Sequence, residues 1–426
     1  MKSRHSTARV ALLAGLALVA GIPATLTAAE IRLQSDTLVR GMARDTGTGK
    51  NQTVAPGYEY LQIDAGQLNE KGVSFHSYGW GRFDFADDQF FEDRSEGELL
   101  YGYLQYADPA TGLDLRVGRQ NIVAGVGNDA IDGLQLSSDL GPWFVVSAYG
   151  GQPVGYDASA GRTGDSIYGG RLGVHQGQYG EVGASYKMLD NNDITVEKTL
   201  GLDLALFLPA DISFYGFSSR NLESKGWAEH SYELRIPVAA VNFRPYFGQY
   251  DYAHYFGTGV NTVNPFRALA ISGEKLRVVG LDTTVKVSDA VDLGVKLKGN
   301  DYDQMNASRY ASGFAAWHAA DLTTVGVEIG YMKGDLDRQK YLLTRVFGYL
   351  DGVAGPGFIS GDLVWARYDQ PIYGRDNSLF VSLGTGRTFL EKALELKLSG
   401  DYSRDPYFNS DVRGLLAVTY RYDHKL

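Results

Sequence analysis

The sequence predicts an all-β protein that folds into a closed antiparallel transmembrane β-barrel of about 22 strands, within a range of 18–22. Three observations lead to this fold class. Apolar and polar residues alternate in runs that recur along the chain. Short links between these runs take turns with longer, polar links. After Ala29 no stretch approaches the ~18 consecutive apolar residues of a transmembrane helix, so strands have to make any membrane crossing.

The composition excludes several other classes of protein. Of the 426 residues, 44% are hydrophobic and 12% aromatic, which is more apolar surface than a disordered chain carries. The chain has no Cys, so it holds no disulfide, thiolate nucleophile, Cys-ligated metal or covalently attached haem. A net charge of −10 argues against binding nucleic acid, because phosphates are held by a basic surface.

The first 29 residues have the features of a cleaved secretory signal. Lys2, Arg4 and Arg9 form a positive start, residues 10–20 are apolar, and Ala28 and Ala29 are small residues at a suitable cleavage site. The apolar stretch is too short to span about 30 Å of hydrocarbon as a helix. We therefore expect residues 1–29 to be a signal peptide and residues 30–426 to form a single barrel domain.

Alternation with a period of two is clearest in four runs, residues 200–208, 291–298, 325–331 and 394–399. Each run matches the ~9–11 residues of a tilted membrane strand. The links at 208–211, 237–239, 288–290 and 319–321 are short, whereas those at 190–197, 299–308, 369–377, 402–410 and 251–273 are longer. Outer-membrane barrels have short periplasmic turns and longer external loops, and an even strand number returns both termini to the periplasm.

The last predicted strand resembles the C-terminal assembly signal of bacterial outer-membrane β-barrels. One face carries the alternating set Gly414, Leu416, Val418, Tyr420 and Tyr422. Four residues follow the final aromatic, whereas the family usually ends on Phe or Trp. Residues 113–120 and 131–134 also look like strand pairs of outer-membrane porins. The resemblance covers the mature chain at the level of pattern, and it implies a channel protein of the porin type or the porin-like sheath of a porin–cytochrome complex.

The inward face follows once the apolar residues are assigned to lipid. Charged side chains facing lipid near the midplane cost about 2–4 kcal/mol for Arg or Lys, so we assign them to the lumen. The predicted pore-lining residues are Arg171, Asp203, Glu229, Glu233, Arg235, Asp282, Lys286, Asp292, Lys296, Lys298, Glu328, Glu395, Lys397, Asp401 and Arg421. The alternative for each of them is an ordinary wall residue with no individual role.

Aromatic residues near the predicted strand ends suit the girdles that barrels place at the lipid headgroups. This expectation covers Tyr58, Tyr60, Trp80, Tyr101, Tyr103, Trp143, Tyr149, Tyr246 and Tyr250. The alternative is that aromatic residues simply favour strands.

Two loops are candidates for narrowing the lumen. The third predicted external loop, residues 120–130, is short and contains two glycines. The loop at 251–273 is longer and rich in aromatic residues, so we expect it to be the better candidate. Acidic residues dominate several predicted external loops, with seven acids against one base between Asp84 and Glu98. This excess predicts a modest preference for cations.

No enzyme signature is present. The His residues are scattered over separate segments, and the chain lacks the nucleophile-elbow, His-Glu-x-x-His and phosphate-loop motifs. We expect no catalytic residue, no metal ligand and no cofactor.

The sequence therefore predicts a passive outer-membrane channel for small hydrophilic solutes or ions, in contact with outer-membrane lipid, lipopolysaccharide and the outer-membrane assembly machinery. The alternative is a barrel sheath around multihaem cytochromes that carries electrons across the outer membrane. A haem centre in that case has to come from another polypeptide.

Overall fold

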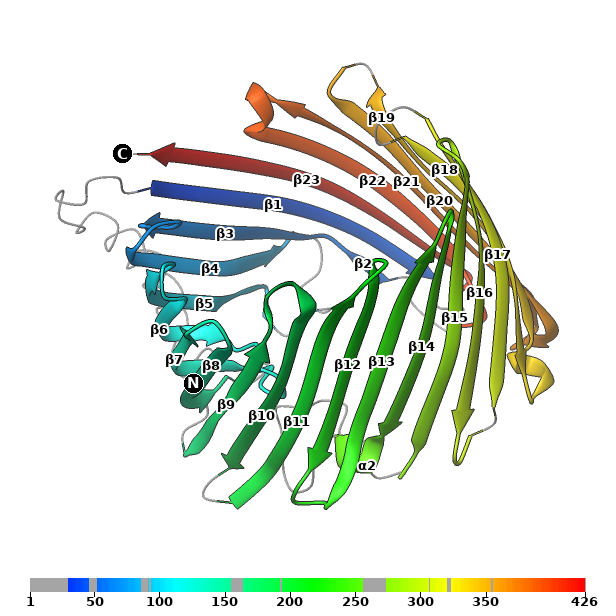
Figure 1. Cartoon of the computed structure of the whole chain (residues 1–426). Helices are drawn as coiled ribbons and strands as arrows, with labels where there is room; N and C mark the ends of the chain where they lie inside the picture. Colours follow the sequence, from blue (N-terminus) through cyan, green and yellow to red (C-terminus); the bar gives the residue numbers. More distant parts are fainter. Residues whose placement is uncertain are drawn as a thin grey trace.

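The chain forms one closed antiparallel β-barrel in the computed structural model (Figure 1). The structure describes residues 30–45, 52–85, 91, 93–154, 164–191, 194–255, 273–305, 307–319, 323–353 and 355–425. The first strand, β1 (Glu30–Asp45), pairs with the last, β23 (Ser410–Lys425), along all 16 of its residues. This seam closes the sheet. Residues 1–29, the predicted signal peptide, lie outside the described residues.

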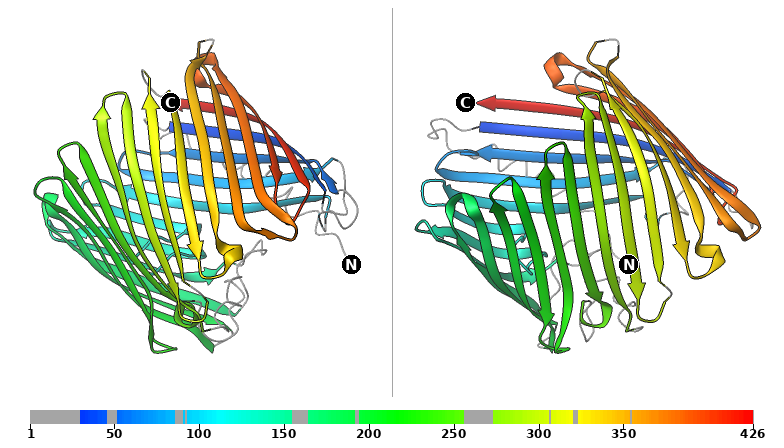
Figure 2. Two further views of the ribbon diagram at one scale, coloured as in Figure 1. Left: turned by 90° about the vertical axis from the view of Figure 1, so that its right-hand side faces the viewer. Right: turned by 45° about the vertical axis from the view of Figure 1, so that its right-hand side comes forward.

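The remaining strands follow one another around the wall, each antiparallel to its neighbours (Figure 2). They are β2 (Gln52–Val54), β3 (Pro56–Gly66), β4 (Gly72–Asp84), β5 (Ser95–Asp108), β6 (Leu113–Asn121), β7 (Ala130–Leu140), β8 (Phe144–Pro153), β9 (Asp165–His175), β10 (Gly180–Asn191), β11 (Ile194–Leu208), β12 (Ile212–Asn221), β13 (Gly226–Val238), β14 (Val241–Asp251), β15 (Lys275–Ser288), β16 (Val291–Tyr302), β17 (Ser308–His318), β18 (Thr324–Gly334), β19 (Tyr341–Val353), β20 (Gly357–Ile372), β21 (Arg375–Phe389) and β22 (Leu394–Arg404). A short helix, α2 (Tyr252–Tyr255), follows β14. Within the described residues, no helix has both the length and the apolar character needed to cross a bilayer.

The barrel has 22 strands in its wall, as the sequence predicts. The sheet contains 23 strand segments, but β2 and β3 both pair with β1 and are separated only by Ala55. They are therefore two parts of one wall strand, which makes the wall count 22. The four runs with the clearest alternation lie in β11, β16, β18 and β22.

Short turns gather at one end of the barrel, which we call the short-turn end, and the described chain begins and ends there. The opposite end carries the longer links, but two of these are shorter than predicted. β10 continues to Asn191 and β11 starts at Ile194. β20 and β21 leave only Tyr373 and Gly374 between them, both with positive φ, 49° and 80°. Two central residues with positive φ are typical of the tight type I′ hairpin turn, so the strands extend where the sequence predicted a loop.

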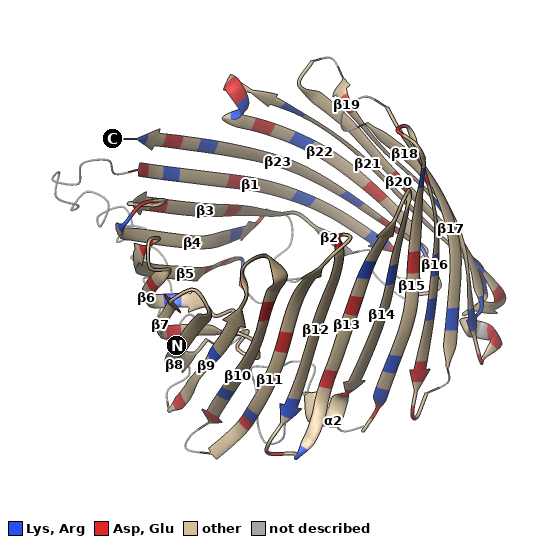
Figure 3. Ribbon diagram, viewed as in Figure 1, with Lys and Arg blue, Asp and Glu red and all other residues tan. Residues whose placement is uncertain are grey.

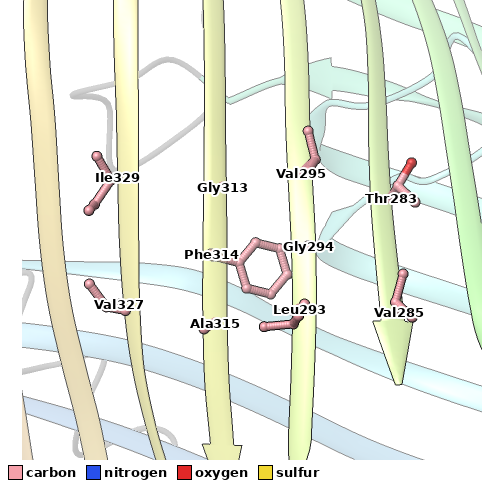
Figure 4. A pocket seen from close by; sticks show the side chains of 10 residues that line it. All are labelled: Thr283, Val285, Leu293, Gly294, Val295, Gly313, Phe314, Ala315, Val327 and Ile329. Carbon is pink, nitrogen blue, oxygen red and sulfur yellow. The ribbon is translucent and has the colours of Figure 1, made fainter. Parts of the chain in front are cut away.

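The two faces of the wall differ in chemistry. In β16, Leu293, Val295 and Leu297 point outward and are exposed, while Lys296 and Lys298 lie on the inward register. The same alternation recurs around the barrel, and Figure 3 shows charged residues of both signs along many strands. β17 has only small residues on its outward face between residues 311 and 315, and a shallow apolar groove forms over it between the side chains of β16 and β18 (Figure 4).

The outward face departs from this rule near the seam. Glu59 lies on the outward register of β3, in the same row as Thr37 of β1. Its carboxylate accepts hydrogen bonds of 2.6 Å from the hydroxyls of Ser35 and Thr37. Gly81 lies opposite Glu59 on β4. An acidic side chain therefore faces outward from the middle of a wall strand.

Candidate functional site: the inner wall

All 15 predicted pore-lining residues occupy the inward register of their strands. They are carried by β9, β11, β13, β15, β16, β18, β22 and β23, and the pairing connects them into one face. For example, Asp282 is paired with Lys296, Lys286 with Asp292, and Lys298 with Tyr310. The inner face is thus continuous across strands that are far apart in the sequence.

The first charged cluster on this face spans three neighbouring strands. Arg171 of β9 donates to Asp203 of β11 from Nε at 3.0 Å and also forms an ion pair with Glu181 of β10. Arg171 is mostly buried by these partners. A guanidinium binds carboxylates through parallel N–H groups, so one Arg can join three strands.

Two clusters follow on the next part of the wall. Arg235 donates to Glu233 at 2.6 Å, and Arg244 pairs with Asp282. Further on, the Lys296 ammonium lies 2.9 Å from Glu328. Glu328 also accepts hydrogen bonds from the hydroxyls of Ser312 and Tyr310, at 2.8 and 3.2 Å.

The last cluster lies beside the seam. Glu395 is bound by Lys397 at 2.9 Å and by Arg421 at 3.1 Å.

The remaining contacts lie at the short-turn end of β15, β16 and β17. Asp292 lies 3.1 Å from the His318 ring. Lys286 turns to Asp289, in the adjoining short turn, at 2.9 Å. Acids and bases on the inner wall therefore compensate each other locally, and such pairs are compatible with an interior that contains water.

A hairpin folds into the barrel between β6 and β7. In residues 122–129 the Ile122 amide donates to the Asp129 carbonyl at 2.8 Å, and Ala124 and Gly127 form a bridge. The amide of Val126 donates to the Ser185 hydroxyl on β10 at 3.0 Å, in a buried position. This hairpin, which we call the inward hairpin, thus lies against the inner wall of the strands that follow it.

Apolar packing and one buried cation hold the inward hairpin. Ile122 and Ala124 belong to a buried cluster whose other members are Ile131, Tyr149, Ile167, Leu189 and Val196. The Lys187 ammonium on β10 lies 2.7 Å from Glu197 and 3.2 Å from Asp129. Gly125 has a φ of +61°, and a Cβ there would collide with the Ser185 hydroxyl. Glycine is therefore needed at this point for both conformation and space.

The preferred constriction loop, residues 251–273, lies largely outside the described residues, but its start is described. α2 packs on the ends of β12 and β13, where the His254 ring hydrogen bonds to Ser224 at 2.8 Å and Asn221 donates to the His254 carbonyl at 3.0 Å. The Tyr255 ring lies 6.2 Å from that of Tyr250, an inward residue of β14. Burial raises the pKa of the Tyr255 phenol above its ordinary value. The loop thus begins by turning toward the interior.

The prediction of aromatic girdles is wrong for most of its residues. Tyr60 lies in the same row as Asp36 of β1, which is paired with Thr419, and Thr419 with Glu395. The same tracing puts Tyr58, Trp80, Tyr101, Tyr103, Tyr149, Tyr246 and Tyr250 on the inward register. Trp143 lies in the turn before β8. Aromatic residues are favoured on strands of either face, so their type alone did not identify the side.

Sequence reasoning missed several charged groups that the structure brings together. Arg345 pairs with Asp362 across β19 and β20, and Asp411 is bound by Arg44 at 2.7 Å and Arg413 at 2.6 Å across the seam. The pairing of Lys187 with Asp129 was also not expected. Alternation could have assigned the strand residues to the inner face, but no pattern in the sequence links a loop residue such as Asp129 to a strand 58 positions away.

A closed 22-strand antiparallel barrel with a polar, charge-compensated inner wall is the class of protein that the fold and this site define. No protein-family model matches the sequence, and no curated protein matches it. Solved structures similar in fold include OpdO of Pseudomonas aeruginosa, with 11% identity, coverage of 93% of this chain and 97% of that one, and a TM-score of 0.44. OccAB4 of Acinetobacter baumannii has 11% identity, 95% and 100% coverage and a TM-score of 0.45. OccK8 (OprE) of Pseudomonas aeruginosa has 11% identity, 93% and 98% coverage and a TM-score of 0.46.

Replacing Gly125 by Val should release the inward hairpin from the wall. The added side chain meets Ser185 and forces a β-branched residue into a left-handed conformation. Hydrogen–deuterium exchange of the amides of residues 122–129 should rise at least tenfold, while the exchange of the flanking strands stays slow.

Gly141→Val is the matched control. Gly141 also has a positive φ, 70°, but it lies in a short turn where a Cβ meets nothing within 4 Å. Equal protection of the hairpin in the Gly125 variant and the wild type would contradict the packing described above.

Proposed function

We propose that this protein is a passive outer-membrane channel of the porin type for small hydrophilic solutes or ions. The observation that carries the proposal is the contrast between an apolar outward face and an inward face of hydrogen-bonded ion pairs on a closed barrel. An interior lined in this way needs water. The 15 inward charged residues are then the pore lining.

Membrane insertion explains the rest of the outward face. Exposed Leu, Val, Ile and aromatic side chains cover it on most strands, which is costly in water and favourable in lipid. We accordingly propose residues 1–29 as the export signal, the bacterial outer membrane as the location, and the outward face of β23 as the segment read by the assembly machinery. Lipid and lipopolysaccharide would surround the barrel.

Two features favour a channel over the cytochrome sheath. The inward hairpin lies against the inner wall, and α2 packs on the ends of β12 and β13, so parts of the chain itself lie inside the barrel and at its long-loop end. Such segments narrow a channel and interfere with an enclosed partner. Because a channel encloses no cytochrome, the native membrane complex should give no haem stain. The chain also performs no catalysis under this proposal.

Shortening the inward hairpin should raise single-channel conductance. Because Ile122 and Asp129 are hydrogen bonded to each other, residues 123–128 can be replaced by Asn-Gly, which forms a two-residue turn, without stretching the strands. The conductance in a planar bilayer should increase, since the hairpin no longer projects into the pore. Unchanged conductance of a correctly folded variant would contradict a constricting role.

The acidic loops should give the channel a modest preference for cations. The wall pairs cancel each other, so acids at the long-loop end, among them Asp301 and Asp335, would set the potential at the mouth. Replacing both by Asn should reduce the reversal potential measured under a salt gradient, whereas Asp289→Asn at the short-turn end should change it less. A clear anion preference of the wild type would reject this prediction.

Replacing Glu59 by Leu should stabilise the barrel in lipid. A carboxylate in the middle of a lipid-facing strand is unfavourable, and for an acid the cost is below the ~2–4 kcal/mol of a cation, so we expect a gain of about 1 kcal/mol in the free energy of unfolding. Urea unfolding in lipid vesicles would measure it. Asp401→Leu, on the inward register of β22, should give no such gain. A loss of stability on Glu59→Leu would mean that this face does not contact lipid.

A further inference from the structure

Six aromatic rings form a continuous patch on the inner wall of β3, β4 and β5. The aromatic patch consists of Tyr58, Tyr60, Tyr78, Trp80, Tyr101 and Tyr103. Successive ring centroids are 5.6–6.3 Å apart. Each ring is only partly buried, so the surface not covered by its neighbours faces the interior. The charge-paired wall formed by β9–β11 and β13–β18 has no comparable run of rings among its described residues.

Hydrogen-bonding groups border the aromatic patch toward the short-turn end. Asp64 binds the His76 ring at 2.6 Å and accepts from Gln62 at 2.8 Å. Asp114 is bound by Arg116 at 2.7 Å and by Gln105 at 2.8 Å. The Arg116 guanidinium also lies 5.5 Å from the Tyr103 ring centre, and the His76 ring stacks on the same Tyr at 4.9 Å. The rings thus adjoin a set of fixed donors and acceptors.

We propose that the aromatic patch is a binding site for neutral oligosaccharides that pass through the channel, an inference that rests on the proposed channel function. A pyranose ring offers a C–H face that packs on an aromatic ring and a rim of hydroxyl groups that both donate and accept hydrogen bonds. The patch supplies the first kind of contact and its border supplies the second.

The charges of the border favour a neutral ligand. The Arg116 guanidinium donates to Asp114 from Nε and Nη2, and Asp64 and Asp36 add negative charge on the same face. At the other end of the patch, the Arg40 guanidinium lies 5.6 Å from the Tyr58 ring centre, so the rings have groups of both signs beside them. Hydroxyl groups pair with either sign, whereas a charged solute is repelled by part of this surface. Because the rings continue across three strands, the patch can contact several sugar units in a row, which favours a chain over a monosaccharide.

Ion-current recordings with maltohexaose and cellohexaose test the proposal. At least one of the two sugars should interrupt the current of the wild-type channel in a concentration-dependent way. Tyr78→Ala and Tyr101→Ala should each weaken this block roughly tenfold, which corresponds to about 1.4 kcal/mol, while Tyr78→Phe should keep it because the ring remains. Tyr349→Ala removes an inward aromatic residue of β19 outside the patch and should leave the block unchanged.

Three results would overturn the proposal: no block by either sugar, equal weakening in Tyr349→Ala, or a patch-dependent block by benzoate in place of the sugars. Trp80 fluorescence, measured in a variant whose other four Trp residues are replaced by Phe and titrated with the same sugars in detergent, reports binding without any current. A conducting channel that binds neither sugar would remove the sugar site and leave the channel function standing. A barrel that binds a sugar but conducts no ions would keep the sugar site and contradict the channel function.

Discussion

The constraint on which the structure depends is that every backbone N–H and C=O group in the wall needs a partner within the wall. Hydrocarbon offers no hydrogen bonds, so a sheet with a free edge cannot remain there. Here the pairing of β1 with β23 removes both edges along their full length. The short β2 has the same role, because its pairing with β1 continues the β1–β3 pairing beyond Ala55 as far as Arg44. The size and chemistry of the interior are consequences of this closure.

Closure also gives each strand two faces with different surroundings, and the charged residues respond to the inner one. On the inward register, neighbouring strands bring acids and bases within hydrogen-bonding distance, as with Arg171 between β10 and β11 and Glu395 between Lys397 and Arg421. Such pairs need neither long loops nor a buried core. The wall is therefore polar and locally neutral. The features that give this interior its individual shape and chemistry are then the loops, the inward hairpin and α2.

The fold could be predicted because alternation is a property of each strand by itself. The strand number and the inward position of residues such as Lys296 and Glu328 follow from it directly. The seam region was harder, since β3 carries Tyr58 and Tyr60 inward and Glu59 outward, which reverses the usual chemistry of the two faces. The girdle prediction failed because most of the aromatic residues that it named lie on the inward register. The sequence indicated residues 120–130 as one of two candidate constrictions and favoured the other. It could not predict the contacts of Asp129 with Lys187 and of Val126 with Ser185 that hold the inward hairpin, because they depend on how distant segments meet.

Taken together, the positions of these features divide the interior into different walls. The inward hairpin lies on β7–β11 and α2 on β12–β14, while the aromatic patch lies on β3–β5. Only β6 separates the strands of the aromatic patch from the strands that hold the inward hairpin. Under the proposed channel function, a solute that passes beside the inward hairpin would therefore move along the neighbouring wall, where Tyr60, Tyr78 and Tyr101 present ring surface. The narrowing by the hairpin and the ring surface would then act on the same molecule.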